Sequence, residues 1–215
     1  MKLILIFVIL IHSQFAFSQV YEFNVEIFNT TKDFLDIKSS SAIAIIRKQS
    51  EQHIQIRSII NPKTRQKVNR QNSVWVIKHK EDYYFNLFYS QDLNQQKTFV
   101  KLDILGKYCA AIIDKNSPNI VKTSQTYYGG GLTGALIKES STWGNNWEDK
   151  NEEKRKILFI NCFNILPMTM AHNKASDGNF LTFNQLKILY PKLKNAKEKP
   201  SFEEVLEIIN ELNKQ

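Results

Sequence analysis

The side chains best suited to acid–base chemistry are few and widely spaced. His172 and Asp177 lie five positions apart in a polar stretch, and Asp149 precedes them. An imidazole and a carboxylate within hydrogen-bond reach can act as a general acid–base pair. The chain contains no nucleophile motif such as G-x-S-x-G to accompany them. We therefore expect a non-catalytic binding or interaction protein of unknown partner. The alternatives are an envelope enzyme with a scattered site around these three residues and a small-ligand carrier in a β-barrel.

The remaining histidines do not form a cluster in the sequence. His53 alternates with Ile54 and shares its strand face with Arg57, which predicts a solvated ring. His79 shares its face with Trp75, which predicts a packed ring or one at the rim of the sheet. Neither spacing matches a local metal-binding motif.

Motifs for metals and nucleotides fail in their context. The stretch 173–184 resembles a calcium loop, but Ala175 and Asn184 stand where an oxygen ligand and a glutamate are required. Gly129 to Gly134 match G-x-G-x-x-G, yet a dinucleotide site needs a buried strand before that motif, and residues 122–126 are polar. A hinge or tight turn fits these glycines better, and an anion-binding nest is the alternative. We expect no metal, cofactor or nucleotide.

Four aromatic residues stand out in the glycine-rich and tryptophan-containing stretch 127–156. They are Tyr127, Tyr128, Trp143 and Trp147, and two asparagines separate the two indoles. Flat rings beside amide groups suit sugar rings or peptide chains. The two interpretations are rings that plug the end of a barrel and rings that bind a glycan or protein partner. These four residues are the predicted ligand-binding set.

A second candidate binding region carries only positive charge. Lys63, Arg65, Lys67 and Arg70 lie in the polar stretch 61–72, which contains no acidic residue. Such a region can bind an anionic polymer. It lacks the interleaved aromatic residues that binders of single-stranded nucleic acid use for stacking, and a solvated loop is the alternative. The net charge of +8 is compatible with either interpretation.

Two cysteines, Cys109 and Cys162, lie among apolar residues of predicted strands. In an oxidising compartment they could form a disulfide, which would close a loop of about 54 residues and contribute roughly 4 kcal/mol of stability. The alternative is a pair of buried free thiols. The spacing of the two Cα atoms decides between them, and the sequence leaves both open.

The elements that would position these residues are mainly β-strands. Apolar and polar residues alternate, as in residues 20–28, and this period of two marks half-buried strands. Short polar links, and Gly106 before the seventh strand, favour sequential antiparallel pairing into a barrel or sandwich. The eighth predicted strand is the apolar run Ile157–Phe163. The first seven are predicted over residues 20–28, 42–47, 53–60, 74–80, 83–89, 98–105 and 107–113.

The C-terminal part of the chain predicts two helices. Thr182 begins the first with a capping box and Pro191 ends it, while Ser201 begins the second in the same way. The apolar stripe of the second helix must be buried, either on the sheet or against a partner protein. We predict a mainly β, α+β fold with a β-domain over residues 19–163 and a helical tail over residues 164–215.

Residues 1–18 predict a cleaved export signal. Lys2 gives a positive start, residues 3–11 form an unbroken apolar run, and Ala16 and Ser18 supply small residues before the cleavage point. The run is too short for a membrane span, which takes about 20 residues. We therefore expect an exported protein, periplasmic or extracellular, with no transmembrane segment after cleavage. The rest of the chain suits one domain, with or without an appendage.

Overall fold

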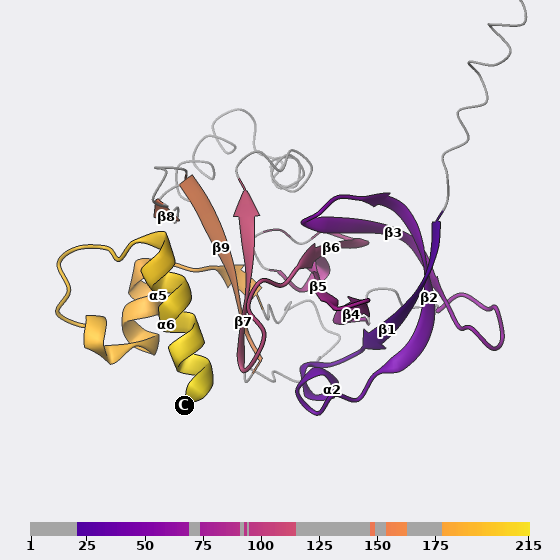
Figure 1. Ribbon diagram of the computed structural model, residues 1–215, viewed down its shortest axis with the longest axis horizontal. Helices are drawn as coiled ribbons and strands as arrows, with labels where there is room; N and C mark the ends of the chain where they lie inside the picture. The colour runs from indigo at the N-terminus through magenta and orange to yellow at the C-terminus, as the bar shows by residue number, and fades with distance from the viewer. Residues whose placement is uncertain are drawn as a thin grey trace, which may run out of the picture.

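The computed structural model describes residues 21–68, 74–90, 93, 95–114, 147–148, 154–162 and 178–215. The predicted export signal and most of the stretch 127–156 lie outside these ranges. Strands dominate the described chain, and this confirms the predicted mainly β, antiparallel fold with C-terminal helices. Figure 1 shows three parts side by side: a barrel, a small sheet at the centre, and helices on its far side.

Six antiparallel strands close the barrel in the order β1-β2-β3-β6-β5-β4. Strands β1 to β3 form one meander and β4 to β6 form another, and the two join where β3 pairs with β6 and β1 pairs with β4. The pairing is therefore not sequential between β3 and β4. Without closure, β1 and β3 would be edge strands, and closure of the barrel gives each of them a second partner. The bounds are β1 Tyr21–Phe28, β2 Ser40–Gln49, β3 His53–Ile60, β4 Val76–His79, β5 Asp82–Asn86 and β6 Thr98–Lys101.

Alternation along these strands divides the barrel side chains between two cores. The inward-facing set forms one apolar cluster: Val25, Ile27, Ala42, Ala44, Ile46, Ile54, Ile56, Ile59, Val74, Ile77, Tyr84 and Phe99. Outward-facing residues such as Val76, Phe85 and Val100 belong to a second cluster, which also contains side chains of the small sheet. The period of two that predicted the strands thus builds both the barrel interior and its contact with the next layer.

The small sheet has the order β10-β9-β7, and β8 also pairs with β9. Its strands are β7 Tyr108–Asp114, β8 Trp147–Glu148, β9 Lys154–Asn161 and β10 Gly178–Phe180. The predicted hairpin around Gly106 differs from what is observed. Strand β6 ends at Lys101 in the barrel, and the chain then crosses to the small sheet, so only an isolated bridge joins Ile104 to Ala110.

The helices cover the face of the small sheet that points away from the barrel (Figure 1). The two long C-terminal helices are α5 Phe183–Leu189 and α6 Phe202–Lys214, and both begin with the predicted capping boxes. Their apolar residues form a third cluster with the sheet residues Ala110, Ile157 and Phe159. A 3-10 turn, η3 Pro191–Leu193, lies between α5 and α6, and another, η2 Leu87–Tyr89, follows β5 in the barrel. Among the described helices, none combines the length and apolarity needed to cross a bilayer.

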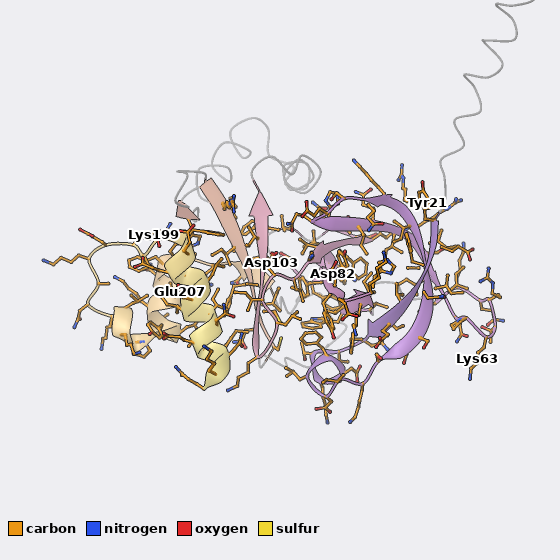
Figure 2. The ribbon with its side chains drawn as sticks, in the orientation of Figure 1. Tyr21, Lys63, Asp82, Asp103, Lys199 and Glu207 are labelled. Atoms are coloured by element: carbon orange, nitrogen blue, oxygen red, sulfur yellow. The ribbon has the colours of Figure 1, made fainter. Side chains whose placement is uncertain are left out.

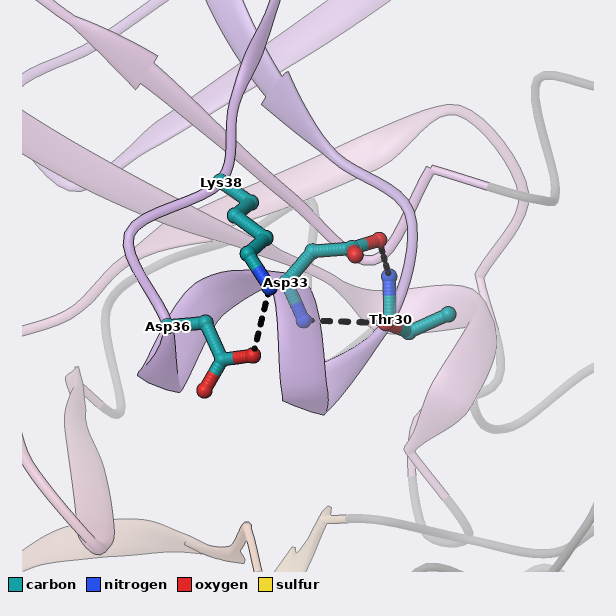
Figure 3. A network of polar contacts seen from close by, with 4 residues as sticks. All are labelled: Thr30, Asp33, Asp36 and Lys38. Atoms are coloured by element: carbon teal, nitrogen blue, oxygen red, sulfur yellow. Dashed lines mark hydrogen bonds and ion pairs between the residues drawn. The ribbon is translucent and has the colours of Figure 1, made fainter.

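A short helix, α2 Thr31–Leu35, joins β1 to β2. Figure 3 shows how it is fixed: Thr30 Oγ1 accepts from the backbone N–H of Asp33, and the Asp33 carboxylate accepts from the backbone N–H of Thr30. Lys38 forms an ion pair with Asp36 beyond the helix, at 3.1 Å. The reciprocal cap satisfies two backbone donors that a helix start would otherwise leave unpaired.

One polar contact fixes α6 to the small sheet. Asn213 Oδ1 accepts from the backbone N–H of Tyr108 at 2.8 Å, and Asn213 Nδ2 donates to the backbone carbonyl of the same residue at 2.8 Å. Gly106 makes room for this amide, since a Cβ at that position would lie 2.7 Å from Asn213 Cγ. Its φ of +145° also lies in the region that favours glycine.

Candidate functional site

Most residues of the predicted catalytic and aromatic sites lie outside the described residues. These are His172, Asp177, Asp149, Tyr127, Tyr128 and Trp143. Within the described ranges, no group of three His, Cys, Asp or Glu side chains is arranged to hold a metal ion.

Trp147 is the described member of the aromatic set, and it is buried. Only 1% of its surface is exposed, and its ring belongs to the cluster between the small sheet and the helices. Lys199 Nζ lies 4.2 Å from the ring centroid, a cation–π geometry that joins the loop before α6 to β8. The helical tail therefore covers this indole.

His53 is buried rather than solvated, with 4% of its surface exposed. Its ring turns back onto the hairpin turn, where Nδ1 lies 2.6 Å from Ser50 Oγ. Burial lowers the pKa of His53 below its ordinary value, and the charge of Lys48 lowers it further. His79 fits its prediction: it is buried and packs on the ring of Phe23, 4.6 Å away between centroids.

The contact between Ser50 and His53 has the residue types of a catalytic pair, because a serine beside an imidazole can become a nucleophile. Ser50 Oγ also accepts from the backbone N–H of His53 at 3.2 Å, and Ser50 N–H donates to the His53 carbonyl at 2.8 Å. These bonds close the turn between β2 and β3. Among the described residues, His53 Nε2 is buried without a hydrogen-bond partner, and none of these residues supplies a third group that orients the ring. The pair stabilises a turn, and S-x-x-H within a polar link is the signal that could have predicted it.

The cationic stretch forms a well-ordered hairpin that continues from β3. We call residues 61–67 the cationic hairpin; all seven are exposed, and Figure 2 shows Lys63 at the outer end of the barrel. Asn61 Oδ1 accepts from the backbone N–H groups of Lys63 and Thr64, at 2.9 and 3.2 Å. Asn61 also exchanges backbone bonds with Arg65 and Gln66, both at 2.9 Å. The asparagine therefore holds the turn from both sides.

The three described cations of this hairpin differ in their surroundings. Arg65 Nη2 lies 3.5 Å from the Glu22 carboxylate, and both side chains are largely exposed, so the pair contributes little stability. Within the described residues, neither Lys63 nor Lys67 forms an ion pair. On this short turn, two ammonium groups are therefore unpaired among the described residues, and one guanidinium has an exposed carboxylate beside it. Arg70, the fourth predicted cation, lies outside the described residues.

Cys109 and Cys162 are in the reduced thiol form, and their sulfur atoms are in contact. Their sulfur atoms are 3.8 Å apart, and neither side chain is exposed. Strand pairing brings them together across a separation of 53 positions.

No protein-family model, curated protein or solved structure gives a significant match to this chain. Function is therefore inferred from the cationic hairpin and from the side chains around it.

Proposed function

We propose that this protein is an exported, non-catalytic binding protein that holds an anionic polymer through the cationic hairpin. The observation that carries the proposal is a projecting turn with every residue from 61 to 67 exposed and with Lys63 and Lys67 unpaired among the described residues. The ligand class is a polysaccharide or other polymer that carries carboxylate, sulfate or phosphate groups. Carboxylate, sulfate and phosphate are all acceptors for ammonium and guanidinium donors.

The internal bonds of the hairpin support this role. The Asn61 side chain and backbone fix the turn before any ligand arrives, so binding does not have to order the backbone. Arg65 already has a weak, exposed carboxylate partner in Glu22, and an incoming anionic group could replace it at little cost. A polymer with repeated charges would contact several cations at once, which raises its apparent affinity.

The non-catalytic part of the proposal has separate support. The sequence contains no nucleophile motif, and the contact between Ser50 and His53 belongs to a hairpin turn. Export is inferred from residues 1–18, which have the charge, apolar run and small residues of a cleaved signal.

Affinity chromatography on immobilised heparin and polygalacturonate tests the proposal, with uncharged dextran as the control matrix. Lys63→Gln/Lys67→Gln should lower the affinity for at least one anionic polymer about tenfold at low salt, since each exposed ion pair contributes roughly 0.7 kcal/mol. The matched control is Lys194→Gln/Lys197→Gln, which removes the same charge from two exposed lysines near the helices.

The two double variants separate a local site from general basicity. If both lose affinity to the same extent, net charge alone governs binding and the hairpin is not the site. If the unaltered chain fails to bind either polymer at low salt, the proposal is overturned.

A further inference from the structure

The two thiols lie on neighbouring strands, on the side of the small sheet that packs against the barrel. Cys109 is in β7, opposite Ile160 of β9, and Cys162 follows the end of β9. The backbone N–H of Cys162 donates to the carbonyl of Lys107 at 3.1 Å, so both cysteines sit within the same hydrogen-bonded ladder. Both side chains belong to the cluster shared by the barrel and the small sheet.

We propose that Cys109 and Cys162 form a disulfide and that the structure shows the reduced form of this pair. Their sulfur atoms are 3.8 Å apart, whereas a disulfide bond measures about 2.05 Å. The sulfurs must approach by about 1.8 Å, and rotation of the two side chains about χ1 would have to supply this movement. The bond would tie β7 to β9 without any change in strand pairing.

The oxidation needs an acceptor for two electrons, and a small-molecule or protein disulfide supplies it. One cysteine loses its proton, and its thiolate attacks a sulfur of the oxidant and displaces a thiolate. The second cysteine, also deprotonated, attacks the protein sulfur of this mixed disulfide and displaces the other half of the oxidant. Two protein thiols and one oxidant disulfide thus become one protein disulfide and the two thiol groups of the reduced oxidant.

Burial determines when this exchange can occur. Neither Cys109 nor Cys162 is exposed in the folded chain, so an oxidant must reach them before the small sheet packs on the barrel. The bond therefore forms during folding. Once the chain is folded, the same burial keeps reductants away from the sulfurs, and reduction requires unfolding.

Refolding the reduced full chain tests this proposal. One sample refolds in a buffer of oxidised and reduced glutathione, and the other in dithiothreitol. After unfolding and alkylation, mass spectrometry should find no alkylated cysteine in the first sample and two in the second. The oxidised chain should melt about 10 °C higher, from loop closure in a chain of this size. Dithiothreitol added to the folded oxidised chain should leave the bond intact.

Cys109→Ala and Cys162→Ala, made singly, are the matched controls, and neither should melt differently in the two buffers. Two alkylated cysteines or glutathione adducts in the glutathione-refolded wild type would overturn the proposal, and so would equal melting temperatures in both buffers. The mass comparison on the wild type decides the question even if an alanine variant fails to fold. This test is independent of polymer binding, because both cysteines lie away from the cationic hairpin.

Discussion

At the scale of single residues, the outer edge of β7 shows how side chains complete a backbone ladder. Of the N–H groups of this strand that point away from β9, three have acceptors of different kinds among the described residues. The donors are Tyr108, Ala110 and Ile112, and their acceptors are Asn213 Oδ1, the Ile104 carbonyl and Asp103 Oδ2. An unpaired strand edge invites pairing with another chain, so these contacts protect the small sheet at this edge.

Asn213→Leu should lower the free energy of unfolding by about 2 kcal/mol, because it removes the two hydrogen bonds that the side-chain amide forms with the N–H and carbonyl of Tyr108. The measurement is urea unfolding of the variant and the wild type. Asn210→Leu is the matched control, since Asn210 is exposed on the same helix and its replacement should change stability little. Equal costs for the two variants would show that the amide of Asn213 has no special role.

A second prediction at this scale concerns pH. The pKa of His53 lies below its ordinary value of 6.5, chiefly through burial, so the unfolded chain binds a proton more readily than the folded chain. The contribution of the neutral ring is complete above pH 6.5 and decreases as the pH falls toward the lowered pKa. His53→Gln removes this titration. The stability of the wild type relative to the variant should therefore decrease as the pH falls below 6.5.

Urea unfolding at three values of pH checks this expectation. Above pH 6.5, the difference in unfolding free energy between the two proteins should be constant. Below pH 6.5, it should shift in favour of His53→Gln. A difference that stays the same at all three values would contradict a buried, neutral His53.

The sequence could not predict the burial of His53, because alternation only tells which side chains share a face. Gln55 and Arg57, on the face predicted to be solvated, are partly or fully exposed, whereas His53 reaches back to Ser50 in the turn. The cationic hairpin was easier to predict, since its charges and turn residues are contiguous. The pairing of Arg65 with Glu22, 43 positions away, depends on the closed barrel, so no local sequence pattern indicates it.

At the scale of elements, the end of α2 contains a residue that fits poorly. Lys38 N–H donates to the Asp33 carbonyl at 2.7 Å and Ile37 N–H donates to the Phe34 carbonyl at 3.2 Å, the two bonds of a Schellman motif. The motif places Ile37 at φ +55°, a conformation that glycine adopts more easily than a β-branched residue. Its side chain is 79% exposed, so packing does not compensate for the strain.

Ile37→Gly should raise the free energy of unfolding by about 1 kcal/mol, because glycine removes the strain of the left-handed conformation and little buried surface is lost. The expected rise in melting temperature is roughly 2–4 °C. Leu35→Gly is the comparison within the same helix, and it should be destabilising because glycine is a poor helix former. A variant Ile37→Gly that is no more stable than the wild type would show that the strain is relieved elsewhere.

The elements that could be predicted are those with a signal of their own. Alternation located β1 to β7 and a continuous apolar run located β9, each to within a few residues, and the capping boxes at Thr182 and Ser201 located α5 and α6. Strands β8 and β10 have two and three residues, too few to show a period. They exist because β9 offers a second edge, which is a consequence of the assembled sheet and not of local sequence.

At the scale of the whole molecule, the small sheet is a middle layer with both faces buried. Side chains of β9 alternate between the two cores: Leu158 and Ile160 face the barrel, while Ile157 and Phe159 face the helices. This explains why residues 157–160 read as a continuous apolar run, which is typical of a strand covered on both faces. The barrel and the helical tail thus depend on the same backbone.

Adjacent substitutions on opposite faces of β9 test whether the layers unfold together. Phe159→Ala removes a side chain from the helix side and Ile160→Ala removes one from the barrel side, and each should cost about 3 kcal/mol. Urea unfolding would be followed by two probes, in a chain whose other tryptophans are replaced by phenylalanine. Circular dichroism reports the helices, and Trp75 fluorescence reports the barrel side of the sheet. Because β9 belongs to both cores, each substitution should lower both midpoints equally. If Phe159→Ala lowered only the midpoint measured by circular dichroism, the helical tail would unfold as a separate unit, and the sheet would remain folded without it.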